Sequence, residues 1–390
     1  RSGHVRYSNS KENFVTNAQP LVAKYKNGNL AIAHNGSLIN ARRIRDEFED
    51  QGLIFTTSSD SEVIASLIAK NFRGNIQEAI TQAMAKVEGS YALVIMTGDK
   101  LIGVRDKRGM RPLVLGSLKN GYVLASETCA LDTLGARYLR DIEPGEIVTI
   151  DKYGYSSISM GSEEHQASCI FEYIYFARAD SFIDGISVYN SRENAGRILA
   201  KEQPASADIV ISVPDSGTPA AIGYAKESGI PFCEGLIKNR YVGRTFIQPD
   251  QSMREIEVAL KLNPLKNIVK GQRIVMVDDS IVRGTTSKII IQTLRDAGAV
   301  EVHVRVASPP VRHSCHFGID TPTTQELIGA DKMMENIRLK IGADSVGYLS
   351  EEGLLESVGV SPTEESGFCT ACFCGKYPME VETYKGGGSL

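Results

Sequence analysis

The sequence has 390 residues, of which 42% are apolar and 23% charged, and its formal net charge is −4 at pH 7. This length and composition are typical of soluble proteins with two or more domains, each able to bury its own core. The weak negative charge and the lack of an apolar run of roughly 20 residues exclude a general attraction to nucleic acid and a membrane-spanning helix, so we expect neither partner.

The chain begins RSGHVRYSNS, without Met and without the pattern of a signal or transit peptide, and we expect a leading segment to be missing. Seven cysteines are too few for a secreted disulfide scaffold, and the odd number argues against complete pairing. These features indicate a reducing compartment, and we expect the cytoplasm, or the plastid stroma if the source is a plant.

The first half of the chain combines helical and strand patterns. Residues 58–70 predict a helix in which Ser59 and Glu62 have the spacing of a capping box, and residues 39–48 also read as helix. Between residues 91 and 160, three pairs of apolar, β-branched runs are separated by the turn signals TGDK, LKNG and DKYG, which predicts three antiparallel hairpins. We therefore expect an α+β domain over residues 1–164.

The second half alternates strictly between strand and helix. Strands are expected at 208–213, 230–237, 273–277 and 301–307, with helices at 191–202, 218–229 and 285–299. This alternation predicts βα units around a parallel sheet, hence an α/β domain over residues 165–330, whose aromatic-rich start at 165–181 joins the two domains. Sequence after residue 320 reads as mostly helical, and we assign residues 331–390 to a helical extension.

The stretch VMVDDSIVRGTTS, residues 275–287, combines a strand end with two carboxylates and a glycine. Gly284 permits a close backbone approach, and the hydroxyls of residues 285–287 join the N–H groups of the next helix, which together favour a phosphate. Asp278 and Asp279 suit sugar hydroxyls or a hard cation such as magnesium. An ordinary strand end followed by a helix cap would use the same residue types.

A second strand ends in VPDSG, which places Asp215 and Ser216 at the expected carboxyl edge of the same sheet. The segment KNRYVGRTF then supplies three cations within residues 238–244, which is compatible either with a solvated basic loop or with a lid that closes over an anion. Two phosphate-compatible turns and a basic lid indicate a polyphosphorylated sugar as the ligand.

These motifs resemble a known family over essentially the whole chain. VMVDDSIVRGTTS resembles the phosphoribosylpyrophosphate signature of type I phosphoribosyltransferases, and VPDSG with KNRYVGRTFIQP is similar to the glutamine phosphoribosylpyrophosphate amidotransferases. The resemblance implies an N-terminal-nucleophile (Ntn) hydrolase-type glutaminase domain followed by a type I phosphoribosyltransferase domain. It also implies the transfer of glutamine-derived ammonia to phosphoribosylpyrophosphate, which gives 5-phosphoribosylamine in the first step of de novo purine biosynthesis.

The resemblance assigns roles to residues of the second domain. Magnesium would be held by Ser216, Asp278 and Asp279, and the two aspartates would also bind the ribose hydroxyls. The full set expected to bind phosphoribosylpyrophosphate is Asp215, Lys238, Tyr241, Arg244, Asp278, Asp279, Ser280, Arg283, Gly284, Thr285, Thr286 and Ser287.

The segments GHVRYS, AHNGSLIN and TSSDSE resemble the glutaminase domain of Ntn amidotransferases. This implies that Arg6 grips the carboxylate of glutamine, that Asn35 and the Gly36 N–H form an oxyanion hole, and that Asp60 binds the substrate ammonium. Each residue also has an ordinary interpretation: Arg6 as a surface ion pair, Asn35-Gly36 as a type I′ turn, and Asp60 as a first-turn helix carboxylate.

The nucleophile of the family is an amino-terminal cysteine, whereas this chain begins with Arg1, and we therefore expect the nucleophile to be absent from this chain. Two alternatives follow. The chain as given would be an ammonia-dependent phosphoribosylamine synthase, or a regulator that binds phosphoribosylpyrophosphate without catalysis.

Cys369 and Cys372 form a CxxC motif, which zinc, a redox pair or chance can explain. The family resemblance implies instead a four-iron four-sulfur cluster, bound by Cys169, Cys315, Cys369 and Cys372. Cys374 is an alternative ligand, while Cys129 and Cys233 lie in apolar contexts and are expected in the core. The resemblance further implies a homotetramer inhibited by purine nucleotides.

Overall fold

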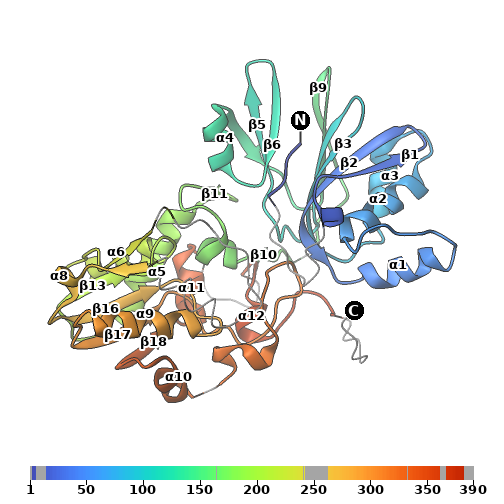
Figure 1. Cartoon of the computed structure of the whole chain (residues 1–390). Coiled ribbons are helices and arrows are strands. Elements are labelled where there is room, and N and C mark those ends of the chain that lie inside the picture. The colour runs from blue at the N-terminus through green and yellow to red at the C-terminus, as the bar shows by residue number, and fades with distance from the viewer. Residues whose placement is uncertain are drawn as a thin grey trace.

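The computed structural model describes residues 2–5, 15–163, 165–239, 241, 262–331, 333–360 and 366–381. Two of the predicted site residues, Arg6 and Arg244, lie outside these ranges. The amino-terminal half and the carboxyl-terminal half form separate bodies, and β10 and α12 lie in the region where the two meet (Figure 1). No helix within the described ranges is long and apolar enough to cross a membrane.

The first domain is built on an antiparallel sheet of six strands in the order β1-β2-β3-β4-β8-β9. A smaller sheet has the order β6-β5-β7. All three predicted hairpins are confirmed, as β3/β4, β5/β6 and β8/β9. The strands are β1 (Leu21–Tyr25), β2 (Gly28–Leu38), β3 (Gly89–Met96), β4 (Leu101–Arg105), β5 (Val114–Leu118), β6 (Gly121–Ala125), β7 (Arg137–Asp141), β8 (Glu146–Asp151) and β9 (Gly154–Ser159).

Alternation along β3 decides which layer covers each face of the six-stranded sheet. Leu93 and Ile95 pack in a core that includes Ile64 and Ile68 of α2, while Ala92 packs on the other side with residues of the smaller sheet. Full burial of each such aliphatic side chain stabilises the fold by about 1.5–3 kcal/mol. The helices of this domain are η1 (Val15–Asn17), α1 (Ala41–Glu49), α2 (Asp60–Asn71), α3 (Ile76–Met84) and α4 (Thr128–Leu134).

The predicted capping box at the start of α2 is half wrong. Ser59 is the N-cap, and its hydroxyl accepts from the Ser61 N–H at 3.3 Å. Glu62 does not return to the Ser59 backbone: its carboxylate accepts from the N–H and hydroxyl groups of Thr56 and Thr57, with the Thr57 N–H at 2.7 Å. The loop before α2 offers four hydrogen-bond donors to the Glu62 carboxylate, and these outweigh the single backbone N–H of Ser59 that a capping box would use.

The second domain is α/β, as predicted, with four parallel strands in the order β13-β16-β17-β18. Val275 and Val277 of β16 face a core that includes residues of α5 and α6, whereas Ile274 and Met276 face one that includes residues of α9 and α10. Helices thus cover both faces. The elements are β13 (Ile209–Ser212), β16 (Arg273–Asp278), β17 (Glu301–Val306), β18 (Ser345–Tyr348), α5 (Val188–Glu202), α6 (Thr218–Ser228), α8 (Lys266–Val269), α9 (Thr285–Asp296), α10 (Met334–Ile341) and α11 (Glu351–Ser357).

Two predicted elements of this half are wrong. Residues 230–237 do not form a strand of the sheet: Phe232 makes one bridge to Val210, and β14 (Leu236–Lys238) pairs antiparallel with β15 (Leu262–Pro264). Pro231 and Gly235 fall within this apolar run, and each weakens a strand. β18 lies where helix was expected and extends the parallel sheet. The short helices η3 (Thr324–Glu326) and η4 (Ile328–Ala330) precede it.

The segment between the domains contains short elements that pair over long distances in sequence. β10 (Ser168–Cys169) pairs in parallel with β19 (Phe368–Cys369) near the carboxyl terminus. The remaining elements are η2 (Glu172–Phe176), a π-helix, β11 (Phe182–Ile183), β12 (Ile186–Ser187) and α12 (Ala371–Cys374).

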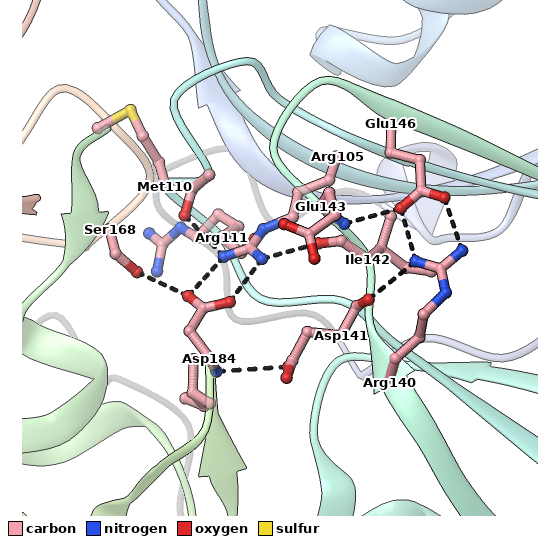
Figure 2. A network of polar contacts seen from close by, with 12 residues as sticks. Arg105, Met110, Arg111, Arg140, Asp141, Ile142, Glu143, Glu146, Ser168 and Asp184 are labelled. Carbon is pink, nitrogen blue, oxygen red and sulfur yellow. Dashed lines mark hydrogen bonds and ion pairs between the residues drawn. The ribbon is translucent and has the colours of Figure 1, made fainter. Parts of the chain in front are cut away.

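A buried arginine joins the two domains (Figure 2). Arg105 at the end of β4 donates to both carboxylate oxygens of Asp184, at 2.7 and 2.8 Å. Its remaining bonds go to the carbonyl oxygens of Gly109, Arg111 and Ile142. Asp184 lies in the β11–β12 turn with φ 47°, a left-handed conformation that aspartate tolerates better than most residues. We call this pair the interdomain clamp.

Candidate functional site

The two predicted sugar-phosphate turns lie side by side. β13 and β16 are parallel neighbours, so the segments that follow them leave the same edge of the sheet. The Val213 N–H donates to the Val277 carbonyl at 2.9 Å, and a Cβ at Gly217 would lie 2.9 Å from that carbonyl oxygen. Ser216 donates its hydroxyl to Asp279, which links the first turn directly to the second.

Asp278 and Asp279 are buried neighbours at this edge, 8% and 7% exposed. Burial, followed by the charge of Asp279, raises the pKa of Asp278 well above its ordinary value. Burial also raises the pKa of Asp279, although hydrogen bonds from Ser216 and Ser280 oppose this, the latter at 2.6 Å. Two repelling carboxylates with hydroxyl neighbours suit a hard divalent cation or the hydroxyl groups of a sugar.

The second turn leads into the amino end of α9. Gly284 is its N-cap with φ +79°, a conformation that favours glycine, and a Cβ there would displace the Ile328 Cδ1 that lies 2.5 Å from its position. Thr285, Thr286 and Ser287 form the first turn, whose N–H groups lack intrahelical acceptors by helix geometry. Arg283 precedes the cap and lies 3.4 Å from Glu326. This end of α9 can receive an anion.

The predicted lid is only partly described. Lys238 ends β14, and its ammonium lies 2.5 Å from the Asp215 carboxylate, with both side chains more than half exposed. Tyr241 is almost fully exposed. The structure therefore brings Lys238 to the first turn, leaves the Tyr241 side chain in solvent, and does not describe Arg244.

Sequence reasoning missed Arg192, a buried arginine of α5. Its Nε donates to the Tyr173 carbonyl and its Nη2 to the Ala177 carbonyl, both at 2.7 Å. It lines a small pocket of about 10 Å³ together with Ser216 and Asp279, and its charge opposes the rise in the Asp279 pKa. The sequence does contain one signal for this residue. Arg192 lies three and seven residues before the apolar Ala195 and Leu199, and this helical spacing marks an inward-facing position.

In the first domain, Asn35 and Gly36 lie inside β2, opposite Ala92 and Tyr91 of β3. They are therefore not the central residues of a hairpin turn, and that alternative is wrong. Gly36 has φ +138°, and a Cβ there would collide with the Ser90 carbonyl group. A glycine is required at this point of the strand.

Asp60 is the first residue of α2, as its ordinary interpretation requires, yet its carboxylate also accepts from the Leu38 N–H at 2.9 Å. Leu38 ends the strand that carries Asn35 and Gly36. The structure thus brings three of the four predicted glutamine-site residues to one end of β2, while Arg6 lies outside the described residues.

Four cysteines from three distant segments converge where the domains meet. Cys169 and Cys369 are register partners in the β10–β19 pair, Cys372 lies in α12, and Cys315 lies in the loop after β17. Burial raises the pKa of the Cys169 and Cys372 thiols, and the nearby charges of Cys315 and Cys369 raise both further. All seven cysteines lie within the described ranges, and none forms a disulfide.

These thiols do not form a single-ion site in the described part of the chain. Among the residues that the structure describes, no three His, Cys, Asp or Glu side chains are close enough to hold one metal ion. A four-iron cluster instead takes one thiolate at each of four separate irons, so its ligands stand further apart. The buried Nε of Arg111, which has no hydrogen-bond partner in the described residues, belongs to a guanidinium group that interacts with Cys169 and Cys315. An anionic cluster fits beside that cation.

The remaining cysteines have other surroundings. Cys374 accepts from the Lys376 N–H at 3.4 Å and contacts Thr370. Cys129 is 4% exposed and is a core residue as predicted, whereas Cys233 is only partly buried and packs against the core of the second domain.

The fold and site together define the class of the protein. A parallel sheet with paired aspartates at its carboxyl edge follows an antiparallel α+β domain. Family models agree: one for a glutamine amidotransferase domain matches residues 4–133, and one for a phosphoribosyl transferase domain matches residues 186–313. The chain is a class II (Ntn-type) glutamine amidotransferase domain joined to a phosphoribosyltransferase domain.

Relatives narrow the class to one family. The amidophosphoribosyltransferases of Archaeoglobus fulgidus and Bacillus subtilis are both 50% identical to the chain over 381 residues, which is 97% of the chain and 83% and 80% of the relatives. The chain belongs to the amidophosphoribosyltransferase family, which carries out the first step of purine biosynthesis. A chloroplastic amidophosphoribosyltransferase of Arabidopsis thaliana is 48% identical over 392 residues, covering 100% of the chain and 69% of the relative.

Solved structures agree with this assignment. A glutamine phosphoribosylpyrophosphate amidotransferase from B. subtilis, complexed with ADP and GMP, matches with a TM-score of 0.90 and 49% identity, over 98% of the chain and 83% of that structure. A structure described as the allosteric regulatory enzyme of purine biosynthesis matches with a TM-score of 0.91, also at 49% identity, over 98% of the chain and 82% of that structure.

Proposed function

We propose that the two sites divide one reaction between the domains. Residues 1–164 receive glutamine and release ammonia, and residues 165–330 bind phosphoribosylpyrophosphate and present its anomeric carbon to that ammonia. Residues 331–390 supply two of the four cluster thiols. One observation carries the proposal: the buried Asp278–Asp279 pair lies at the edge of a parallel sheet, directly before the glycine-capped amino end of α9.

The second domain would bind its substrate at both turns. Asp278 and Asp279 would accept hydrogen bonds from the ribose hydroxyls, and the first turn of α9 would bind the 5′-phosphate. The helix end contributes about 0.3–1 kcal/mol, so hydroxyl donors are needed beside it. They come from Ser280, Thr285, Thr286 and Ser287, with Arg283 and Gly284 completing this turn, while Asp215, Lys238, Tyr241 and Arg244 would cover the pyrophosphate.

Magnesium fits the same turns. Ser216, Asp278 and Asp279 would hold it, because the two carboxylates repel each other and Ser216 already contacts Asp279. When bound, the ion would balance charge on the departing pyrophosphate.

In the first domain, Asn35 and the Gly36 N–H would stabilise the oxyanion of the glutamine reaction. Asp60 would bind the ammonium group of glutamine, and Arg6 its carboxylate. The support is the position of Asn35, Gly36 and Asp60 at one end of β2.

We further infer a four-iron four-sulfur cluster on Cys169, Cys315, Cys369 and Cys372. It would join the interdomain segment, the loop after β17 and the carboxyl terminus, a structural role. By analogy with the B. subtilis relative that holds ADP and GMP, purine nucleotides would act as feedback inhibitors. The assembly expected from family resemblance is a homotetramer in the cytoplasm, or in the plastid stroma of a plant.

An ammonia-dependent assay tests the sugar-phosphate site separately from the glutamine site. With ammonia, phosphoribosylpyrophosphate and magnesium, Asp279→Ala should lower kcat/KM by about 100-fold or more, since a charged group in contact with substrate is lost. Asp208→Asn is the control, because Asp208 pairs with Arg273 at the opposite edge of the sheet. Unchanged kinetics in Asp279→Ala would remove this residue from the site, and no pyrophosphate release by the wild-type protein would favour a non-catalytic regulator.

Metal analysis tests the cluster. The purified protein should be brown and contain about four irons per chain, and Cys315→Ser should lose both properties while Cys233→Ser retains them. Stoichiometric zinc without iron would overturn the assignment.

A further inference from the structure

The loop that carries Cys315 also reaches the glutamine half of the protein. Two residues after this cysteine, the Phe317 carbonyl accepts from the Ser90 hydroxyl at 2.8 Å and from Arg111 Nη2 at 2.9 Å. Both donors belong to the first domain and are buried, Ser90 completely. The Phe317 N–H points back to the Cys315 sulfur, 3.3 Å away. One residue, Phe317, therefore connects the cysteine cluster to the first domain.

The next residue lies against the strand of the glutamine site. Gly318 has φ +93°, and a Cβ there would lie 2.9 Å from the carbonyl carbon and 3.1 Å from the Cα of Gly36. Gly36 also lies against Ser90, whose carbonyl leaves no room for a Cβ and whose hydroxyl accepts from the Ser37 N–H at 3.2 Å. Gly36 thus contacts a residue of its own domain and a residue of the other.

Arg111 binds the Phe317 carbonyl from the cluster side. It is buried, with Nη1 on Glu172 at 2.7 Å and Nη2 on Phe317. A guanidinium group with a planar set of fixed donors holds the Phe317 carbonyl in one direction.

We propose that Phe317 and Gly318 of the second domain are positioning residues for the glutamine reaction of the first, because they set the place of the Asn35–Gly36 strand. When the cluster orders Cys315, it also orders Phe317, whose carbonyl accepts from Ser90. Ser90 and Gly318 together then hold Gly36 in place. This inference rests on the proposed roles of Asn35, Gly36 and Cys315. Its consequence is that damage to this contact affects the use of glutamine and spares the use of ammonia.

Gly318→Ala, made in the full-length protein so that the glutamine reaction can be measured, tests the contact, with Gly229→Ala as its matched control. Both glycines have positive φ, +93° and +74°, but a Cβ at Gly229 meets no atom within 4 Å. A displacement of about 1 Å in a catalytic group costs on the order of 100-fold, so Gly318→Ala should lower glutamine-dependent synthesis by roughly that factor. Ammonia-dependent synthesis should stay within about twofold of wild type, and Gly229→Ala should leave both activities unchanged.

Ser90→Ala is a milder second variant that adds no atoms. It removes the hydrogen bonds to Phe317 and Ser37, and the ratio of glutamine-dependent to ammonia-dependent activity should fall, by about 10-fold, with kcat affected more than KM. An unchanged ratio in both Ser90→Ala and Gly318→Ala overturns the proposal. Asn35→Ala distinguishes failure of the proposed oxyanion hole from failure of the proposed contact. If Asn35→Ala, like the other two variants, leaves the use of glutamine intact, the assigned oxyanion hole is wrong. If only Asn35→Ala loses the use of glutamine, the oxyanion hole stands and the contact is rejected.

Hydrogen exchange tests the connection to the cluster without measuring activity. In Cys315→Ser, amides of residues 33–38 and 88–92 should exchange at least about 10-fold faster than in wild type, while Cys233→Ser should match wild type. Visible absorption and iron content show whether each variant holds the cluster. Unchanged protection in a cluster-free Cys315→Ser protein contradicts the connection.

Discussion

At the scale of single residues, Asp278 and Asp279 at the edge of the parallel sheet lower the stability of the folded protein when they are ionised. The pKa of Asp278 is raised by burial and by Asp279, and that of Asp279 by burial, so ionising the pair costs free energy in the folded protein. Because the folded pKa values lie above the unfolded ones, this cost is absent below the ordinary aspartate range, near 3.9, and grows as pH rises toward the folded values. A ligand that needs both charges must offset it.

Asp278→Asn should therefore stabilise the protein without magnesium at pH 7.5, by about 1 kcal/mol, and should bind phosphoribosylpyrophosphate more weakly. The stabilisation should vanish at about pH 3, below the ordinary aspartate pKa, where the wild-type carboxyl is protonated in both states. Thermal unfolding at the two pH values, with titration of the substrate, measures both effects. A gain in melting temperature that is equal at both pH values would show that repulsion is not the cause.

Sequence reasoning recognised residues whose chemistry is local and missed those whose role depends on tertiary contacts. Asp278, Asp279 and Gly284 could be predicted because a strand end, two acids and a glycine are contiguous in sequence. Arg111 could not, since a buried arginine reads as a surface residue until the carbonyl groups that surround it are known. For Arg192 the helical spacing indicates an inward-facing position but not the carbonyl groups that it binds.

At the scale of elements, β7 and β8 are joined by a bidentate ion pair (Figure 2). Arg140 donates to both oxygens of Glu146, at 2.7 and 2.6 Å, and the Glu143 N–H donates to the same carboxylate at 2.8 Å. Burial raises the pKa of Glu146, but these hydrogen bonds outweigh it, so the net shift is downward. The pair thus stabilises the fold above the ordinary glutamate range, and that contribution is lost as pH falls through the lowered pKa.

Glu146→Gln should accordingly lower the free energy of unfolding by about 1 kcal/mol at pH 7, a modest value because Arg140 is one-third exposed to solvent. At about pH 3 the variant and wild type should differ much less. Urea unfolding at both pH values checks this. Glu335→Gln, which breaks an exposed pair with Arg338, is the control and should change stability by only a few tenths of a kcal/mol.

Elements with strong periodicity were predictable, and elements defined by their neighbours were not. The three hairpins combine apolar alternation with turn residues, both of which are visible in sequence. β18 has only four residues and becomes a strand because β17 offers it an open edge. Residues 230–237 have the apolar run of a strand, yet only Phe232 bridges to β13 and only the last two residues enter the separate β14.

At the scale of the whole molecule, the interdomain clamp holds a buried charge between two domains. The Arg105 side chain is 2% exposed, and Asp184 is its carboxylate partner, 34% exposed. Removing one partner of a buried pair costs about 3–5 kcal/mol because the other charge is left uncompensated. None of this was predictable from the sequence, since the partners are 79 residues apart and each lies in an ordinary turn or strand end.

Asp184→Ala should destabilise the protein by about 3 kcal/mol, the lower part of that range, because water can reach the partly exposed site. Calorimetry of the variant should then resolve two unfolding transitions, one for each domain, whereas those of the wild type should lie closer together in temperature. The double variant Arg105→Met/Asp184→Ala should recover part of the loss, since no buried charge remains. If the double variant is no more stable than Asp184→Ala, the penalty does not come from the unpaired guanidinium.

The pairing of β10 with β19 has a consequence for how the protein is made. Ser168 leaves the ribosome roughly 200 residues before its partner Phe368, so the joint between the domains closes only after residue 368 has been made. Until then Cys169 and Cys369 remain apart. A nascent chain can thus fold its two cores in turn, while the contact between them waits for β19 to emerge.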